Sequence, residues 1–184
     1  MLVLLDRDGV LNEDRADFVK SPGELVLIAG AADAVARLTR TGHKVAIVTN
    51  QSCVGRGLID EHMLARIHDH LRQLLHRAGA RIDGIFHCSD PPWAATERRK
   101  PGPAMLREAR RHFRTAAEDC VMIGDSLSDL EAAQRAEMRR ILVRTGKGAA
   151  TQGKGIPTHV LPVAVYDDLA EAVDALLGQE IPHP

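Results

Sequence analysis

Short apolar segments alternate with amphipathic stretches along the chain. The clearest apolar segments are 2–5, 44–48, 82–87, 120–123 and 140–143. Uninterrupted apolar runs of this length are typical of strands that are buried on both faces of a sheet. We therefore predict five buried strands, and a shorter apolar stretch at 159–161 is a candidate edge strand.

The stretches between these runs carry apolar residues at helical spacing. The longest begins after Asp60, a suitable N-cap, and ends near Gly79. The predicted helices are 30–40, 60–79, 101–113, 127–136 and 166–177, whereas 88–100 and 145–155 have loop composition. This alternation predicts an α/β fold with a doubly wound parallel sheet. We expect one domain over residues 1–184, with no separate cap domain.

Composition excludes several classes of protein. With 24 Lys and Arg against 25 Asp and Glu, the chain lacks the basic excess of a nucleic-acid-binding protein. Aromatic residues make up 3% of the chain, too few for a base-stacking platform. Cys53, Cys88 and Cys120 are widely spaced and do not form a disulfide framework, and no apolar run approaches the length of a membrane span. We expect a cytoplasmic monomer that acts on a small molecule.

Polar residues follow the predicted strands where each strand ends. In a parallel sheet, ligands bind beyond the carboxyl ends of the strands, so these residues are expected to meet at one edge. They are Asp6 and Asp8 after the first strand, Thr49, Asn50, Gln51 and Ser52 after the second, and Asp125 and Ser126 after the fourth, with Asp129 one helical turn further on.

Three of these carboxylates, on Asp6, Asp8 and Asp125, require a compensating charge. Two carboxylates ~4 Å apart repel by roughly 4 kcal/mol at an effective dielectric of ~20, so a proton or a cation must lie among them. Oxygen ligands with no nearby His or Cys favour Mg²⁺. Lys100 precedes Pro101 and is expected to present its ammonium at a helix N-terminus. A metal, an ammonium and the Thr49 hydroxyl around a carboxylate predict phosphoryl transfer, in which Asp6 attacks phosphorus and Asp8 moves protons.

Four motifs in this order resemble those of the haloacid dehalogenase (HAD) superfamily of phosphatases. They are Asp-Arg-Asp-Gly-Val at 6–10, Thr49 after an apolar strand, Lys100-Pro101, and Gly124-Asp125 with Asp129. The resemblance implies that Asp6 is the nucleophile and Asp8 the acid and base. It also implies that Mg²⁺ binds Asp6, Asp125 and the backbone carbonyl of Asp8.

Further motifs resemble the branch that holds heptose bisphosphate and histidinol-phosphate phosphatases. These are Thr-Asn-Gln-Ser at 49–52, Gly-Arg-Gly at 55–57, Arg99-Lys100-Pro101 and Val-Arg-Thr-Gly-Lys at 143–147, and the Ser52 and Arg56 pattern is closer to the heptose enzymes. This resemblance assigns the phosphoryl group to Thr49, Arg99 and Lys100. It assigns substrate contacts to Asp14, Arg15, Ala16, Asp17, Asn50, Gln51, Ser52, Arg56 and Ser126.

The segment 88–100 departs from the family pattern, in which many members carry a zinc loop. Only Cys88 remains, while Asp90, Thr96 and Arg98 stand where the other ligands would be. One thiolate cannot form a four-ligand zinc site, so we predict no zinc and a loop held by packing of Pro91, Pro92 and Trp93.

Several alternatives stay open at this point. Histidinol phosphate is a rival substrate, and a phospho-accepting signalling domain is a rival of another class. Asp129 either orients the site or is an ordinary surface charge of its helix, and Lys147 lies in a Gly-rich loop with weak phosphate-binding character. The histidines His62, His68, His70 and His76 are expected on the solvated face of their helix.

Overall fold

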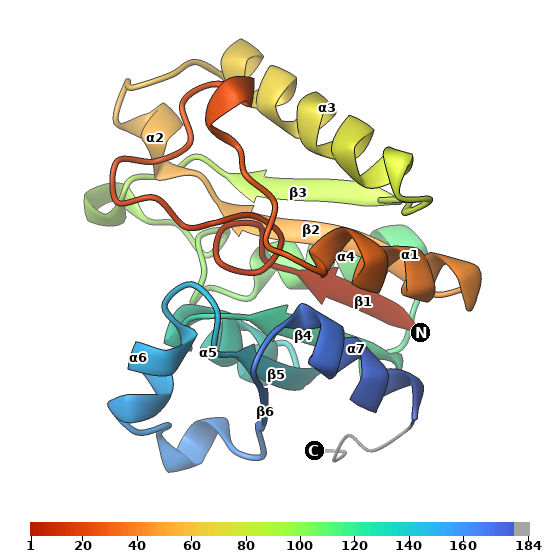
Figure 1. Ribbon diagram of the computed structural model, residues 1–184. Coiled ribbons are helices and arrows are strands. Elements are labelled where there is room, and N and C mark those ends of the chain that lie inside the picture. Colours follow the sequence, from red (N-terminus) through yellow and green to blue (C-terminus); the bar gives the residue numbers. More distant parts are fainter. Residues whose placement is uncertain (179–184) are drawn as a thin grey trace.

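The computed structural model describes residues 1–178, which are built around one parallel six-stranded sheet (Figure 1). The strands are β1 (Leu2–Leu5), β2 (Lys44–Asn50), β3 (Gly84–Cys88), β4 (Cys120–Gly124), β5 (Arg139–Val143) and β6 (Ala164–Tyr166). Their order in the sheet is β3-β2-β1-β4-β5-β6, and every neighbouring pair is parallel. The predicted doubly wound α/β architecture is confirmed.

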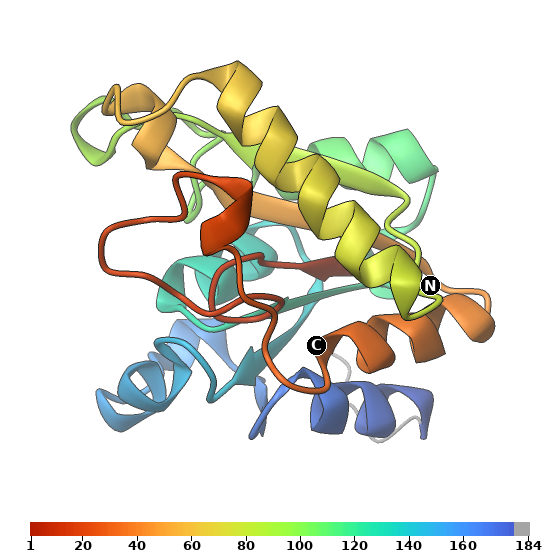
Figure 2. The ribbon, with the colours of Figure 1, turned by 45° about the horizontal axis from the view of Figure 1, so that its top comes forward.

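Helices cover both faces of this sheet, as the two views in Figures 1 and 2 show. Along β1, Val3 and Leu5 point to one face and Leu2 and Leu4 to the other, because side chains alternate along a strand. The first face packs against α1 (Ala31–Arg40), α3 (Glu61–Arg77) and α7 (Leu169–Leu177). The second packs against α4 (Ala104–Phe113) and α5 (Leu127–Arg135). Burial on both faces explains the unbroken apolar runs of the central strands.

Helices α3 and α5 begin at residues whose side chains accept hydrogen bonds from free backbone N–H groups. The carboxylate of Asp60 accepts a hydrogen bond of 2.7 Å from the backbone of Met63 at the start of α3. At the start of α5, Ser126 and Asp129 form a capping box, with the Ser126 backbone N–H 3.0 Å from Oδ2 of Asp129. No helix within residues 1–178 is both long and apolar enough to cross a membrane.

Three sequence predictions about the elements are wrong. The candidate strand at 159–161 overlaps a 3₁₀ turn, η4 (Thr158–Val160), because the buried Arg140 guanidinium donates hydrogen bonds to the carbonyls of Val160 and Leu161. The edge strand of the sheet is β6 instead. The predicted loop 145–155 contains a short helix, α6 (Gly148–Gly153). The helix expected from residue 101 begins at Ala104, after a tight turn at Gly102.

Candidate active site

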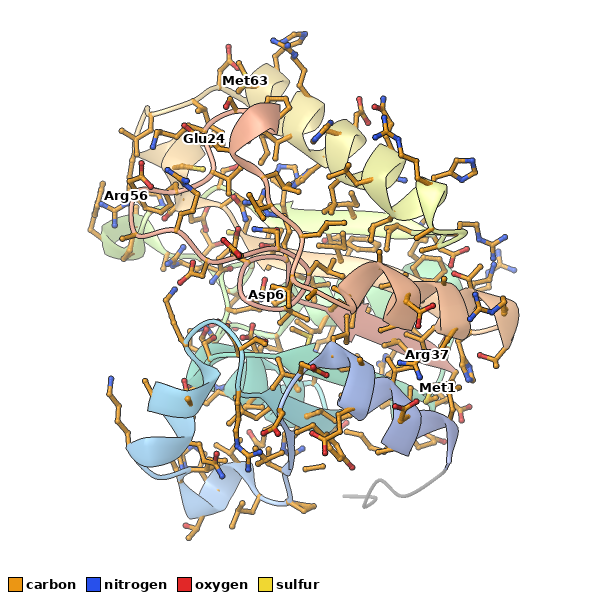
Figure 3. All side chains as sticks on the ribbon, in the orientation of Figure 1. Met1, Asp6, Glu24, Arg37, Arg56 and Met63 are labelled. Carbon is orange, nitrogen blue, oxygen red and sulfur yellow. The ribbon has the colours of Figure 1, made fainter. Side chains whose placement is uncertain are left out.

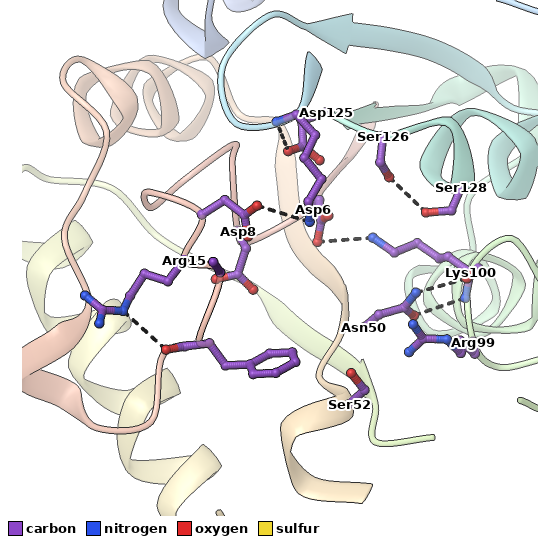
Figure 4. Close-up of a pocket in the computed structure, with 14 residues that line it drawn as sticks. Asp6, Asp8, Arg15, Asn50, Ser52, Arg99, Lys100, Asp125, Ser126 and Ser128 are labelled. Atoms are coloured by element: carbon purple, nitrogen blue, oxygen red, sulfur yellow. Dashed lines mark hydrogen bonds and ion pairs between the residues drawn. The ribbon is translucent and has the colours of Figure 1, made fainter. Parts of the chain in front are cut away.

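A cavity of about 480 Å³ opens at the carboxyl ends of the central strands (Figure 4). Because β1 lies between β2 and β4, the residues after these three strands meet there, as predicted from the alternation of elements. The residues that line the cavity are Asp6, Asp8, Asp14, Arg15, Ala16, Phe18, Asn50, Ser52, Arg99, Lys100, Asp125, Ser126, Ser128 and Lys147.

Three carboxylates gather at the floor of this cavity. Oxygens of Asp6, Asp125 and Asp129 all lie within 4.8 Å of one another. Burial raises the pKa of Asp6 to about 6, with further repulsion from Asp129 and Asp8 against the lowering effect of Lys100. Burial likewise raises the pKa of Asp125 to about 7, reinforced by the charges of Asp6 and Asp129. The cluster therefore carries more negative charge than its protein surroundings compensate.

Lys100 supplies a positive charge to this cluster. Its Nζ lies 2.5 Å from Asp129 Oδ1 and 3.1 Å from Asp6 Oδ1, and donates a hydrogen bond of 2.8 Å to the carbonyl of Val48. Burial alone would lower the pKa of Lys100, but Asp129 and Asp6 together raise it to about 12. Asn50 fixes the Lys100 backbone through two hydrogen bonds of 3.0 Å (Figure 4). Lys100 thus reaches the site from a turn and not from the helix N-terminus that the sequence suggested.

The residues present fit a bound Mg²⁺. Three carboxylates lie around one ammonium, and the atoms that they offer to a metal are oxygens, the ligand type that Mg²⁺ prefers. The backbone of Gly9 and Gly146 passes against Asp125: a Cβ at either glycine would lie 2.1 or 2.2 Å from Asp125 Oδ2. Both glycines have positive φ, so the chain can close tightly around this carboxylate. Asp6 and Asp125 are the residues that would hold the metal.

Asp8 is fixed by its neighbours beside this cluster. The fully buried Arg7 guanidinium contacts both carboxylate oxygens at 2.9 and 3.0 Å. Asn12 and Gln51 donate further hydrogen bonds of 2.9 and 2.8 Å. Burial would raise the pKa of Asp8, but the Arg7 charge and these hydrogen bonds hold it below its ordinary value. The orientation of the Asp8 carboxylate is therefore fixed by the residues on its buried side.

Thr49 and Gln51 lie beneath the cavity surface. They are 1% and 2% exposed, and Gln51 Nε2 donates to Thr49 Oγ1 over 2.9 Å as well as to Asp8. Neither residue belongs to the lining of the cavity. Gln51 therefore supports the carboxylate of Asp8 from the buried side, and Thr49 accepts a second hydrogen bond from the same Gln51 amide.

The residues expected to contact substrate are distributed around the rim. Asp14, Arg15, Ala16, Asn50, Ser52, Arg99 and Ser126 line the cavity. Asp17 does not: its exposed carboxylate pairs with Arg15 and Lys20. Arg56 is also outside the lining, and its guanidinium lies over two aromatic rings. Asp129 is fully buried, which excludes the reading of it as a surface charge.

Sequence reasoning missed several residues of the site. Phe18 and Ser128 line the cavity without belonging to any motif, and Lys147, considered only weakly, lines it and pairs with Asp14 at 3.1 Å. The expectation that His68 is solvated is wrong, because it is buried with Nε2 3.4 Å from Arg7 Nη1. Its spacing of four residues after Leu64 and three before Leu71, both buried, is the signal that could have placed it on the inner face.

The segment that replaces a zinc loop is closed by hydrogen bonds. Oδ2 of Asp90 accepts from the backbone N–H and the hydroxyl of Thr96 at 2.9 and 2.6 Å. The carbonyl of Asp90 accepts a bond of 2.9 Å from Arg99, which lines the cavity. The expectation that Trp93 packs within this loop is wrong, since the residue is 69% exposed and its ring lies against Arg56, outside the loop. The absence of zinc stays a prediction.

Comparisons with known proteins identify relatives over nearly the full chain. The family described as HAD-hydrolase-like matches residues 97–172. The D-glycero-beta-D-manno-heptose-1,7-bisphosphate 7-phosphatase of Pseudomonas aeruginosa is 40% identical, over 96% of this chain and 97% of the relative. The enzyme of the same name from Neisseria meningitidis serogroup A is 39% identical, over 92% of this chain and 91% of the relative.

A solved structure is similar at the level of the whole fold. The crystal structure of D,D-heptose 1,7-bisphosphate phosphatase from B. bronchiseptica, complexed with magnesium and phosphate, has a TM-score of 0.91 and 40% identity. The match covers 97% of this chain and 98% of that chain. A second heptose bisphosphate phosphatase structure, from Burkholderia thailandensis, has a TM-score of 0.75 and 35% identity, over 96% of this chain and 97% of that chain.

Proposed function

Since this chain belongs to the family of the D-glycero-D-manno-heptose-1,7-bisphosphate 7-phosphatases, which are HAD-like hydrolases, we propose that it removes the 7-phosphate of D-glycero-D-manno-heptose 1,7-bisphosphate. The protein is a phosphatase that acts on phosphoric monoesters. The observation that carries the proposal is the position of Asp6 in the cavity, where its carboxylate lies within 4.8 Å of acidic oxygens of Asp125 and Asp129 and 3.1 Å from the Lys100 ammonium.

Asp6 is the proposed nucleophile. One of its oxygens attacks phosphorus, a P–O bond to Asp6 forms, and the P–O bond to the sugar breaks. The negative charge on the transferred oxygens is stabilised by the Lys100 ammonium, which is fixed in advance by Asp129 and Asn50. A bound Mg²⁺ would neutralise part of the phosphoryl charge and orient the group for attack.

Asp8 is the proposed acid and base. In the first half-reaction its carboxyl gives a proton to the departing sugar oxygen, and in the second its carboxylate removes a proton from the water that attacks the aspartyl-phosphate. Arg7, Asn12 and Gln51 favour the carboxylate form, which suits the second half-reaction. A negatively charged phosphoryl group beside Asp8 would raise its pKa and so favour protonation before the first.

The surrounding cations fit an anionic sugar substrate. Arg15, Arg99 and Lys147 line the cavity beyond the reaction centre. We propose that the partner is a small sugar bisphosphate and that the protein acts as a cytoplasmic monomer, without a nucleic acid or a membrane. The three free, buried cysteines are compatible with a reducing compartment.

The test compares heptose 1,7-bisphosphate with histidinol phosphate, each assayed with Mg²⁺ and with a chelator. We expect Mg²⁺-dependent release of one phosphate per heptose bisphosphate, with kcat/KM above that for histidinol phosphate. A kcat/KM for histidinol phosphate that is higher by about tenfold, or ~1.4 kcal/mol, would reverse the assignment. A stable aspartyl-phosphate without turnover would instead indicate a phospho-accepting signalling domain.

A further inference from the structure

The guanidinium of Arg56 lies between two aromatic side chains at the outer wall of the cavity. Its Cζ is 4.9 Å from the ring centroid of Trp93 and 5.7 Å from that of Phe18. Both distances lie within the range of cation–π attraction. Figure 3 labels Arg56 at the outer edge of the molecule, beside the loops that follow β1 and β3. We call this arrangement of Phe18, Arg56 and Trp93 the clasp.

The clasp joins three segments that follow three different strands. Phe18 comes from the loop after β1, Arg56 follows the short helix α2 (Ser52–Gly55), and Trp93 lies in the 3₁₀ turn η2 (Pro92–Ala94) after β3. The last two segments also touch through their backbones, with Gly55 N–H donating to the carbonyl of Ser89 over 3.1 Å. A Cβ at Gly55 would lie 2.3 Å from that carbonyl oxygen, so the close approach requires glycine.

Phe18 connects the clasp to the substrate cavity. Phe18 lines the cavity, and its backbone has φ of +64°, a left-handed conformation that bulky residues rarely adopt. The turn is held by the Phe18 N–H donating to the carbonyl of Arg15 and by Arg15 Nε donating to the carbonyl of Phe18, at 3.2 and 3.3 Å. Such strain persists only where surrounding contacts fix the residue, and Arg56 provides one of them.

We propose that the clasp positions the outer wall of the cavity and thereby selects the leaving group of the substrate, an inference that rests on the proposed function. Arg56 does not line the cavity, so it acts through the two rings that it holds and not by contacting phosphate. The reaction centre around Asp6 does not depend on it. Arg56 is therefore a positioning residue, and Phe18 is the member of the clasp that faces the sugar.

The test compares a sugar substrate with one that lacks a sugar. Arg56→Ala, Trp93→Ala and Phe18→Leu are assayed on heptose 1,7-bisphosphate and on p-nitrophenyl phosphate, with Arg66→Ala, on the exposed surface of α3, as the matched control. We expect each clasp variant to raise KM for the heptose bisphosphate about two- to fivefold, the range of a cation–π contact at an exposed site. In Arg56→Ala and Trp93→Ala, whose altered residues lie outside the cavity lining, both kcat and the parameters for p-nitrophenyl phosphate should stay at wild-type values.

Trp93 is the single tryptophan of the chain, so its fluorescence reports on the clasp directly. Arg56→Ala should increase quenching of Trp93 by acrylamide and lower its anisotropy, and Phe18→Leu should change both in the same direction. Arg56→Lys should resemble Arg56→Ala, because an ammonium cannot stack as a planar guanidinium does. These measurements need no substrate, so they test the clasp even if wild-type protein does not hydrolyse heptose bisphosphate.

Three results would overturn the proposal. If Arg56→Ala raises KM while Trp93→Ala does not, Arg56 contacts the substrate directly. An equal loss of activity on both substrates would place Arg56 in the reaction centre. Unchanged Trp93 fluorescence in Arg56→Ala would show that the three side chains do not associate in solution.

Discussion

Nζ of Lys100 lies 2.5 Å from Oδ1 of Asp129, and both side chains are buried. The other oxygen of Asp129 accepts from the Ser126 backbone at the start of α5. Asp129 therefore connects the beginning of a helix to the ammonium that faces Asp6. The helix that packs against β4 fixes the charge of Lys100 at the point where phosphoryl charge would develop.

Asp129→Asn tests whether this connection positions Lys100. The amide keeps the volume and the cap but removes the charge that balances the ammonium, so we expect kcat to fall about 10- to 100-fold, as for other partners that orient a site. Loss of one member of a buried pair should also lower the free energy of unfolding by about 3 kcal/mol. Steady-state assays and urea unfolding measure the two effects. Asp69→Asn on the exposed face of α3 is the control, and a wild-type kcat in Asp129→Asn would contradict the role.

Asp6→Asn and Asp8→Asn separate the two halves of the proposed reaction. The amide of Asp6→Asn cannot attack phosphorus, so turnover should be abolished. Asp8→Asn keeps the nucleophile but lacks both the acid for the departing sugar oxygen and the base for the attacking water, so turnover should stall, and the phosphorylated protein that forms slowly should persist. Intact-protein mass spectrometry after a short incubation with substrate and Mg²⁺ measures the adduct. Near-wild-type turnover in either variant is incompatible with the assignment.

Gly9→Ala tests the close approach of the chain to Asp125. A Cβ at Gly9 would lie 2.1 Å from Asp125 Oδ2, and the φ of +80° is unfavourable for alanine. We expect the carboxylate to be displaced and the Mg²⁺ concentration needed for half-maximal activity to rise by about 10-fold or more. Gly153→Ala in α6, where a Cβ would meet no atom within 4 Å, is the matched control. An unchanged Mg²⁺ dependence in Gly9→Ala would show that Asp125 tolerates displacement.

Sequence alone predicted the sheet and the edge where the site lies. The unbroken apolar runs identify central strands, and parallel topology brings the residues that follow them together, which is why Asp6, Asn50 and Asp125 could be placed at one edge. The irregular segments between the helices and strands could be predicted less well from the sequence. The strand expected at 159–161 was wrong because Arg140, distant in sequence, binds the carbonyls there.

Side-chain orientation within the site could not be read from motifs. Thr49 lies near the end of β2 and Gln51 follows the strand directly, yet both are buried, because the side chain of Gln51 turns inward to Thr49 and Asp8. Phe18 faces the cavity through a left-handed backbone that no local residue type indicates. Both features depend on contacts between loops that only the folded chain brings together.

Arg140→Met tests the support of the turn before β6. The guanidinium donates to the carbonyls of Met138, Val160 and Leu161, and it has no carboxylate partner among its described hydrogen bonds and ion pairs. Methionine fills much of the volume but leaves three acceptors without donors, so the free energy of unfolding should fall by about 2–4 kcal/mol. Urea unfolding measures the loss. Activity of the folded fraction should be unchanged, since the turn lies away from the cavity lining; a loss of kcat in that fraction would contradict this separation.

His68 makes stability depend on pH below neutrality. Burial lowers the pKa of His68 to about 3, and the positive charges of Arg7, His87 and Arg72 act in the same direction against Asp8. Since Arg7 only donates hydrogen bonds, Nε2 of His68 must accept, which requires the neutral ring. Protonation therefore removes this contact and places a cation beside a cation.

The direction in which stability changes with pH follows from the difference in proton binding between the folded and the unfolded chain. Between pH 6.5 and 3 the unfolded chain binds a proton at His68 that the folded chain excludes, so the free energy of unfolding falls as pH decreases through this window. The loss attributable to His68 should reach about 2 kcal/mol between pH 6.5 and 5, at ~1.4 kcal/mol per pH unit. At pH 6.5 half of the unfolded rings are still protonated, so the dependence fades above this pH and disappears about one pH unit higher, where both states hold a neutral ring.

His68→Gln isolates this contribution, because its amide oxygen can accept from Arg7 and does not titrate. Urea unfolding of wild type and variant at pH 7, 6 and 5 should show a stability difference that moves in favour of the variant as pH falls. His62→Gln, on the exposed face of the same helix, should show a constant difference. If the curves for wild type and His68→Gln stay parallel from pH 7 to 5, then the folded protein admits a charged ring at this position.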